Sequence, residues 1–88
     1  MPNVEETLAE REKTHGSFCD VAKTSQQLKD IVRSYAAGRH FAYSQLEALD
    51  NICQKMARIV NGDNNHVDSW HDIAGYATLI ERELEDES

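Results

Sequence analysis

Proline, glycine and cysteine are all scarce in this sequence. Its 88 residues include one proline, four glycines and two cysteines. So few Gly and Pro residues argue against long flexible linkers and confine the expected disorder to the chain ends. Cys19 and Cys53 do not form a CxxC pair, and both lie among apolar residues at helical spacing. We therefore expect two buried thiols in a reducing compartment rather than a disulfide.

Long hydrophobic runs are also missing. No run approaches the ~18 apolar residues that a membrane-spanning helix needs. The segment from Met1 to Glu6 has no basic region followed by a hydrophobic one, as a secretory leader would. These absences predict a protein of the cytoplasm of the cell that makes it, with no membrane partner.

Basic residues are the minority among the charges. Sixteen acidic residues face nine basic ones, which gives a formal net charge of −7. This balance opposes attraction to phosphate backbones, so generic nucleic-acid binding is not expected. Much of the acidity lies near the C-terminus, at Glu81, Glu83, Glu85, Asp86 and Glu87. We expect one helical domain over residues 1–84 and an acidic, solubilising tail over residues 85–88.

The length of the chain bears on its stability. Eighty-eight residues fall within one domain and bury only roughly 60–65% of the unfolded surface. A monomer of this size is marginally stable, which favours a homo-oligomer. One face of the last helical segment, with Gly75, Tyr76 and Leu79, combines small and aromatic side chains and is the expected interface.

Four segments carry apolar residues at helical spacing, and none alternates long enough to form a strand. The expected helices cover Val4 to Lys13, Phe18 to Ala37, Ser44 to about Gly62, and Ser69 to Glu83. A capping box at Ser44 and Glu47 opens the third, and Asp68 is the expected N-cap of the fourth. The predicted fold is all-α, a compact bundle of three long helices and a short N-terminal helix.

The apolar stripes predict which residues form the core of this bundle. The expected core residues are Phe18, Leu28, Leu49, Met56, Trp70, Ile73 and Ala77. Gly38 is placed to follow the second helix in a left-handed conformation.

Four carboxylates on the third and fourth helices are candidate metal ligands. They form the patterns Glu47-x-x-Asp50 and Asp68-x-x-x-Asp72 on helices that a short loop makes antiparallel neighbours. Mg²⁺ prefers such oxygen ligands and keeps waters for a phosphate substrate. The alternative is an exposed polar face, because Glu47 and Asp50 lie opposite the apolar stripe of their helix.

Two basic groups are candidate phosphate ligands. Lys55 and Arg58 lie one turn apart on the third helix, where they could instead form salt bridges with Asp72. Arg11 and His15 precede Gly16 near a helix N-terminus, whose backbone N–H groups favour anions. The histidines lack zinc-binding spacing, and no strong catalytic motif occurs.

Three segments, residues 11–18, 55–59 and 68–77, resemble a family of small phage and prophage proteins of unknown function. That family is more distantly similar to nucleotide-modification-associated and MazG-like helical proteins. Their pyrophosphohydrolase members bind Mg²⁺ through Glu-x-x-Glu followed by Glu-x-x-Asp. Glu47-x-x-Asp50 is similar to the first motif. Asp68-x-x-x-Asp72 departs from the second, with one residue too many and no Glu.

The sequence therefore predicts a phage-type accessory protein that binds a nucleotide or another phosphorylated ligand. The resemblance implies a Mg²⁺-dependent MazG-like hydrolase or an inactive relative of one. The alternative is a non-enzymatic interaction factor that modulates a host protein through an acidic helical surface.

Overall fold

The computed structural model describes residues 3–87, and Met1, Pro2 and Ser88 lie outside this range. Within it the chain forms four helices, α1 (Val4–His15), α2 (Phe18–Ala36), α3 (Tyr43–Asn61) and α4 (Val67–Glu87). They contain 12, 19, 19 and 21 residues, and residues 3–87 contain no strand. The all-α prediction is confirmed, and the helix lengths follow only roughly the expected order of a short helix and three long ones.

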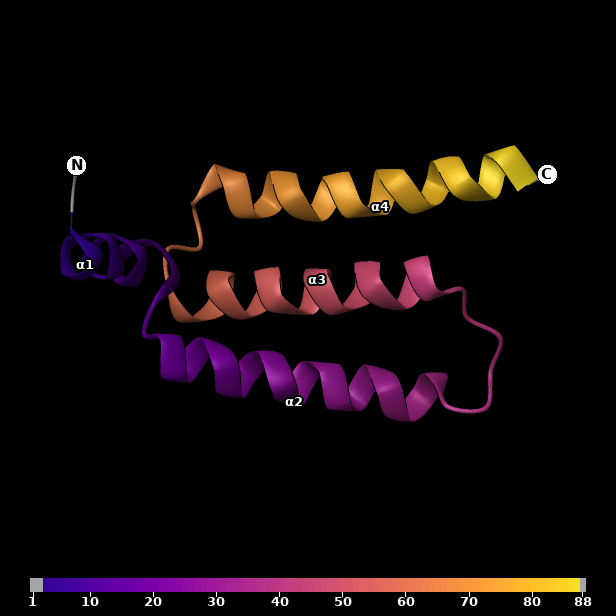
Figure 1. The fold of residues 1–88 in the computed structure, drawn as a ribbon, viewed down its shortest axis with the longest axis horizontal. Helices are drawn as coiled ribbons and strands as arrows, with labels where there is room; N and C mark the ends of the chain where they lie inside the picture. Colours follow the sequence, from indigo (N-terminus) through magenta and orange to yellow (C-terminus); the bar gives the residue numbers. More distant parts are fainter. Residues whose placement is uncertain (1–2, 88) are drawn as a thin grey trace.

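The three long helices lie side by side in one layer, with α3 in the middle (Figure 1). Helix α3 packs against both α2 and α4, whereas α2 and α4 make no contact with each other within residues 3–87. Helix α1 lies at one end of the layer and packs on α2 and α3. The structure is therefore more open than the compact bundle that we expected.

Helix α3 begins one residue earlier than its predicted start. Ala42 is its N-cap residue, and the backbone N–H of Ala42 donates to Oε1 of Gln45 at 2.9 Å. The predicted capping box at Ser44 and Glu47 is wrong, because Gln45 already occupies the position that reaches back to the cap. The Ser44 hydroxyl instead donates to Oε2 of Glu83 at 2.6 Å, which ties the start of α3 to the last turns of α4.

Helix α4 is longer than expected at both ends. It starts at Val67, so Asp68 lies in its first turn and is not its N-cap. A carboxylate there still complements the positive end of the helix dipole. The helix continues to Glu87, so residues 85–87 of the predicted tail belong to α4.

The core consists of two narrow strips, where α3 contacts α2 and where it contacts α4. The buried apolar residues among those described are Val21, Ala48, Cys53, Ala57 and Ile59. The predicted core residues Phe18 and Trp70 are 85% and 54% exposed, so their placement was wrong. Met56 and Ala77 are also exposed. Because α2 and α4 do not contact each other, each of these helices is covered mainly along the stripe that faces α3.

The remaining predicted core residues, Leu28, Leu49 and Ile73, are half-buried. Cys53 is buried as expected, whereas Cys19 is exposed, and both thiols are free. In the described part of the chain, no helix is long and apolar enough to cross a membrane.

Candidate functional site

Two glycines allow the α1–α2 turn to meet the α3–α4 turn. A Cβ on Gly16 would lie 2.2 Å from the carbonyl oxygen of Asn61, and one on Gly62 would lie 2.4 Å from that of Thr14. The backbone N–H of Asp63 donates to the Thr14 carbonyl at 2.7 Å. This close contact places the C-terminal turn of α1 beside the C-terminal end of α3.

A hollow of about 360 Å³ opens where α1, α2 and α3 meet. Its walls come from both sides of the α1–α2 turn and from one side of α3. The lining residues are Leu8, Arg11, Glu12, His15, Gly16, Phe18, Val21, Gln54 and Arg58. Three of the four predicted phosphate ligands, Arg11, His15 and Arg58, are therefore brought together.

The two guanidinium groups of the hollow are available for a ligand. Neither Arg11 nor Arg58 forms an ion pair with any residue between 3 and 87. Glu12 is the acidic residue in the lining. Helix α2 begins at the hollow, where Ser17 caps it by accepting a hydrogen bond from the Asp20 N–H at 3.5 Å. The positive end of a helix dipole adds to the two guanidinium charges.

His15 lies at the centre of this basic group. Its ring packs edge-on against that of His66, with ring centroids 5.6 Å apart. Its Nδ1 atom is buried and has no hydrogen-bond partner in the described part of the chain. Burial lowers the pKa of His15, and the charges of Arg58, His66, Lys55 and Arg11 lower it further. His15 is therefore a neutral imidazole at pH 7 when no anion is bound.

Lys55, the fourth predicted phosphate ligand, has a partner within the protein. Its Nζ lies 3.0 Å from Oδ2 of Asp72, and its side chain is only 14% exposed. The hydrogen bond from Lys55 holds the pKa of Asp72 below its ordinary value. The salt bridge considered for Asp72 is thus formed with Lys55 and not with Arg58.

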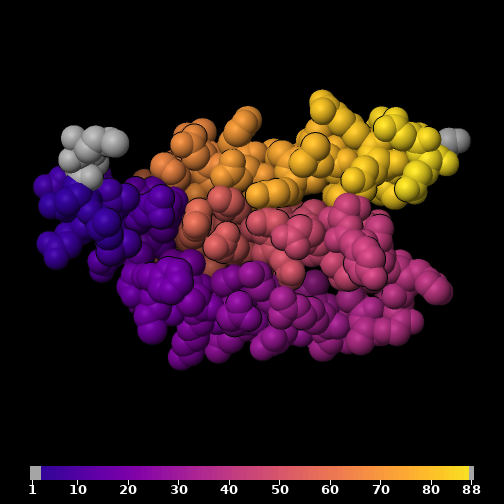
Figure 2. Space-filling model, viewed as in Figure 1, coloured from indigo at the N-terminus to yellow at the C-terminus, as the bar shows by residue number. Residues whose placement is uncertain are grey.

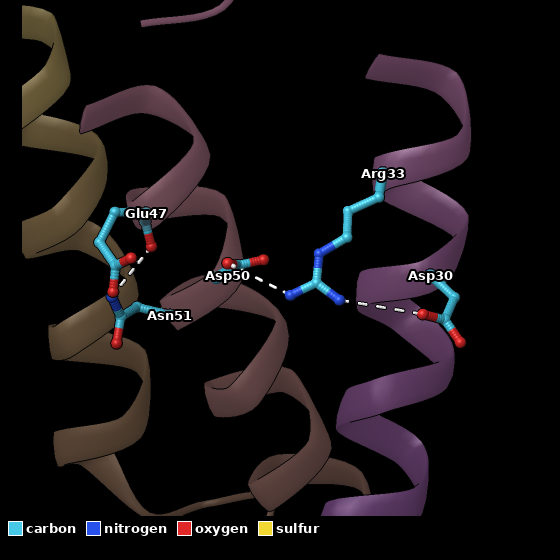
Figure 3. Close-up of polar contacts among 5 residues, drawn as sticks. All are labelled: Asp30, Arg33, Glu47, Asp50 and Asn51. Carbon is cyan, nitrogen blue, oxygen red and sulfur yellow. Dashed lines mark hydrogen bonds and ion pairs between the residues drawn. The ribbon is translucent and has the colours of Figure 1, made fainter. Parts of the chain in front are cut away.

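The side chains of the first predicted carboxylate pair, Glu47 and Asp50, point in different directions (Figure 3). Oδ2 of Asp50 points toward α2 and lies 3.6 Å from Nη2 of Arg33. Nη1 of the same guanidinium lies 3.9 Å from Oδ1 of Asp30. Oε1 of Glu47 accepts a hydrogen bond from the Asn51 side chain at 3.3 Å. Glu47 and Asp50 therefore face away from each other.

The second predicted pair is also divided. Asp68 lies 3.9 Å from Nε2 of His66, and Asp72 pairs with Lys55. Among residues 3–87, no group of three or more His, Cys, Asp and Glu side chains could hold a metal ion. The four predicted ligands within one chain therefore do not fit a Mg²⁺ site, and no catalytic step through a metal follows from their arrangement.

The predicted interface residues lie along α4. Gly75 and Leu79 are exposed and Tyr76 is half-buried, beside a shallow hollow that His71 and Arg82 also line. Their role in self-association stays a prediction. Gln54, which lines the basic hollow, and Gly62, which packs against the backbone of Thr14 and His15, were not predicted as site residues. The only signal for Gly62 was its position directly after a helix, like Gly16.

Comparisons of the chain with family models, with curated proteins and with solved structures give no match. The resemblance to phage and MazG-like proteins therefore stays a prediction.

Proposed function

We propose that this protein binds a phosphorylated small molecule, with nucleotides as the expected class, in the hollow at the α1–α2 turn. One observation carries the proposal. Arg11 and Arg58 come from different helices, form no ion pair within residues 3–87, and line the same hollow as His15. In a chain of net charge −7, unneutralised cations gathered in one hollow favour an anionic ligand.

The chemistry of the lining suits a phosphate with an apolar substituent. Guanidinium groups bind phosphate oxygens in a bidentate manner, and charge-assisted hydrogen bonds of this kind are the strong ones. Phe18 and Leu8 provide apolar surface on the same hollow, where a nucleobase or another ring could pack. The volume of about 360 Å³ lies within the range of small-molecule sites.

The proposal covers binding alone. Hydrolysis and a Mg²⁺ requirement stay predictions from the resemblance, as does a phage origin. The interaction-factor alternative requires only an acidic helical surface, and it predicts no response to phosphates.

Replacing Arg58 or Arg11 by glutamine is expected to weaken binding of AMP, ATP and pyrophosphate. Each change removes one set of charge-assisted hydrogen bonds, worth about 1.5–3 kcal/mol, so the dissociation constant should rise roughly 10- to 100-fold. Isothermal titration calorimetry gives this constant directly. Arg39→Gln is the matched control, because Arg39 is exposed in the α2–α3 connection and does not line the hollow.

Two calorimetric outcomes would contradict the proposal. One is the absence of heat with all three phosphates at millimolar concentration. The other is an equal loss of affinity in Arg39→Gln and Arg58→Gln, which would indicate general charge attraction rather than a site.

Anion binding is expected to strengthen as the pH falls from 7.5 toward 5.5. The pKa of His15 is lowered in the ligand-free protein, and a bound dianion would raise it, so binding takes up a proton. Sulfate is the probe, because it does not titrate in this range. His15→Gln should remove most of the pH dependence, and an unchanged pH profile in this variant would show that another group is responsible.

Lowering the pH strengthens anion binding, but through the same lowered pKa of His15 it should destabilise the ligand-free protein. The unfolded chain protonates His15 at the ordinary value of 6.5, whereas the folded chain does so only at lower pH. The free energy of unfolding should therefore fall as the pH drops from 6.5 to the folded pKa, and then stop changing through this group. Urea denaturation of wild type and His15→Gln across this range isolates the contribution.

A further inference from the structure

The molecule exposes far more surface than a compact monomer of its mass. Its accessible surface is 6766 Å² for 10.0 kDa, whereas surface scaling gives roughly 5200 Å². Its radius of gyration is 15.1 Å, compared with about 12 Å for a compact domain of 88 residues. The excess follows from the open layer, in which both broad sides of α3 remain uncovered by α2 and α4. Figure 2 shows one of these sides, with α3 atoms at the surface between the two outer helices.

One broad side of the layer is apolar along α3. Leu49, Met56 and Val60 are spaced seven and four residues apart, which places them on one stripe of the helix. Met56 is 37% exposed and Val60 is 70% exposed. The opposite stripe of α3 carries Gln54 and Arg58, which line the basic hollow.

Helix α4 continues the same apolar side. Trp70, Ala77 and Leu84 recur every seven residues, and all three are exposed. Ala77 and Leu84 line a groove of about 610 Å³ between α4 and α3, whose other wall includes Leu49. The two apolar stripes therefore face the same side of the layer, with the groove between them.

We infer that a second copy of this chain packs on the apolar side formed by the Leu49–Met56–Val60 and Trp70–Ala77–Leu84 stripes. The surface excess of roughly 1500 Å² per chain matches what each subunit of a homodimer buries, about 1000–2500 Å². A two-fold interface uses the same patch on both subunits, so one apolar side on each chain can supply both halves of it.

This interface is independent of the proposed anion site. The basic hollow lies on the other side of α3, so a second copy on the apolar side leaves Arg58 and His15 accessible. It also differs from the interface expected at Gly75 and Leu79, because Leu79 lies outside the α4 stripe that lines the groove.

Two leucines on α4 give a matched test. Leu84 lines the groove and is 51% exposed, whereas Leu79 lies outside it and is 56% exposed. Light scattering coupled to size exclusion, over a dilution series, should show a dimer for wild type and for Leu79→Glu. Leu84→Glu should be monomeric at concentrations where wild type is dimeric. Trp70 fluorescence should shift to longer wavelength and become more accessible to acrylamide in the monomeric variant.

The remaining outcomes each overturn the inference. A monomeric wild type at high micromolar concentration would show that no second copy binds. Dissociation by Leu79→Glu with Leu84→Glu still dimeric moves the interface to the other face of α4. If both variants are dimers, the interface lies elsewhere on the molecule.

A further variant covers the case in which Leu84→Glu unfolds. Val60→Lys introduces a charge at a position that is already 70% exposed in the single chain. Its unfolding midpoint should stop depending on protein concentration, whereas the wild-type midpoint rises with concentration. An identical concentration dependence in the two proteins would show that Val60 lies outside the interface.

Discussion

Gly16→Ala is expected to destabilise the protein more than any other glycine substitution. Gly16 has φ +86°, a conformation that L side chains rarely adopt, and a Cβ there would lie 2.2 Å from the Asn61 carbonyl oxygen. Backbone strain of about 1–3 kcal/mol and overpacking of a similar size would act together. We expect a loss of more than about 2 kcal/mol in the free energy of unfolding, measured by urea denaturation.

Substitutions at the other three glycines separate the effect of the positive φ from the effect of the close contact. Gly62→Ala introduces the close contact at an ordinary φ of −129°. Gly38→Ala introduces the positive φ, +77°, with no atom among the described residues within 4 Å of the new Cβ. Gly75→Ala introduces neither and should stabilise α4 by about 0.5–1 kcal/mol. A loss for Gly38→Ala as large as that for Gly16→Ala would mean that the contact between the turns contributes little.

The contact between the turns also predicts an effect on ligand binding. Gly62→Ala should displace His15, because its Cβ would meet the His15 backbone 2.4 Å away. Binding of pyrophosphate should weaken in this variant, whereas Gly38→Ala should leave it unchanged. Equal affinity in Gly62→Ala and wild type would show that the hollow does not depend on this contact.

The helices were predictable because their determinants are local. Apolar spacing and the glycines after each of the first three helices marked helix-forming segments close to those observed. The capping error at α3 was also local, since Gln45 formed the cap interaction that we assigned to Glu47. Periodicity identifies the apolar stripe of a helix, but it does not reveal how many partners cover that stripe. For this reason Trp70 was expected in the core and is half exposed.

Part of the site was predictable, because the residues within each basic group are close together in the sequence. The sequence indicates Arg11 and His15 as one basic group and Arg58 as part of another. The packing of α1 against α3 brings the two groups together, and the packing of α4 against α3 pairs Lys55 with Asp72. The spacing of Glu47 and Asp50 suggested a shared site. Helix α3 lies between two other helices, however, and Asp50 turns toward Arg33 on α2.

Ile59→Ala is expected to cause a large loss of stability through the core. Ile59 is 7% exposed and is the largest of the five buried apolar residues in the described range. Truncating a buried isoleucine to alanine removes apolar contact and leaves a cavity, at a cost of about 2–5 kcal/mol. With a core this narrow, α3 has few other large side chains to compensate. The free energy of unfolding from urea denaturation, monitored by circular dichroism, measures the loss.

The matched control is Val67→Ala at the first position of α4. Val67 is 75% exposed, so its truncation should change the stability by less than about 0.5 kcal/mol. A loss for Val67→Ala close to that for Ile59→Ala would show that Val67 is covered in solution. Phe18 tests the open layer, because a closed bundle would give a large loss at this position as well. In the open layer Phe18→Ala should resemble the Val67 control, because the Phe18 side chain is 85% exposed.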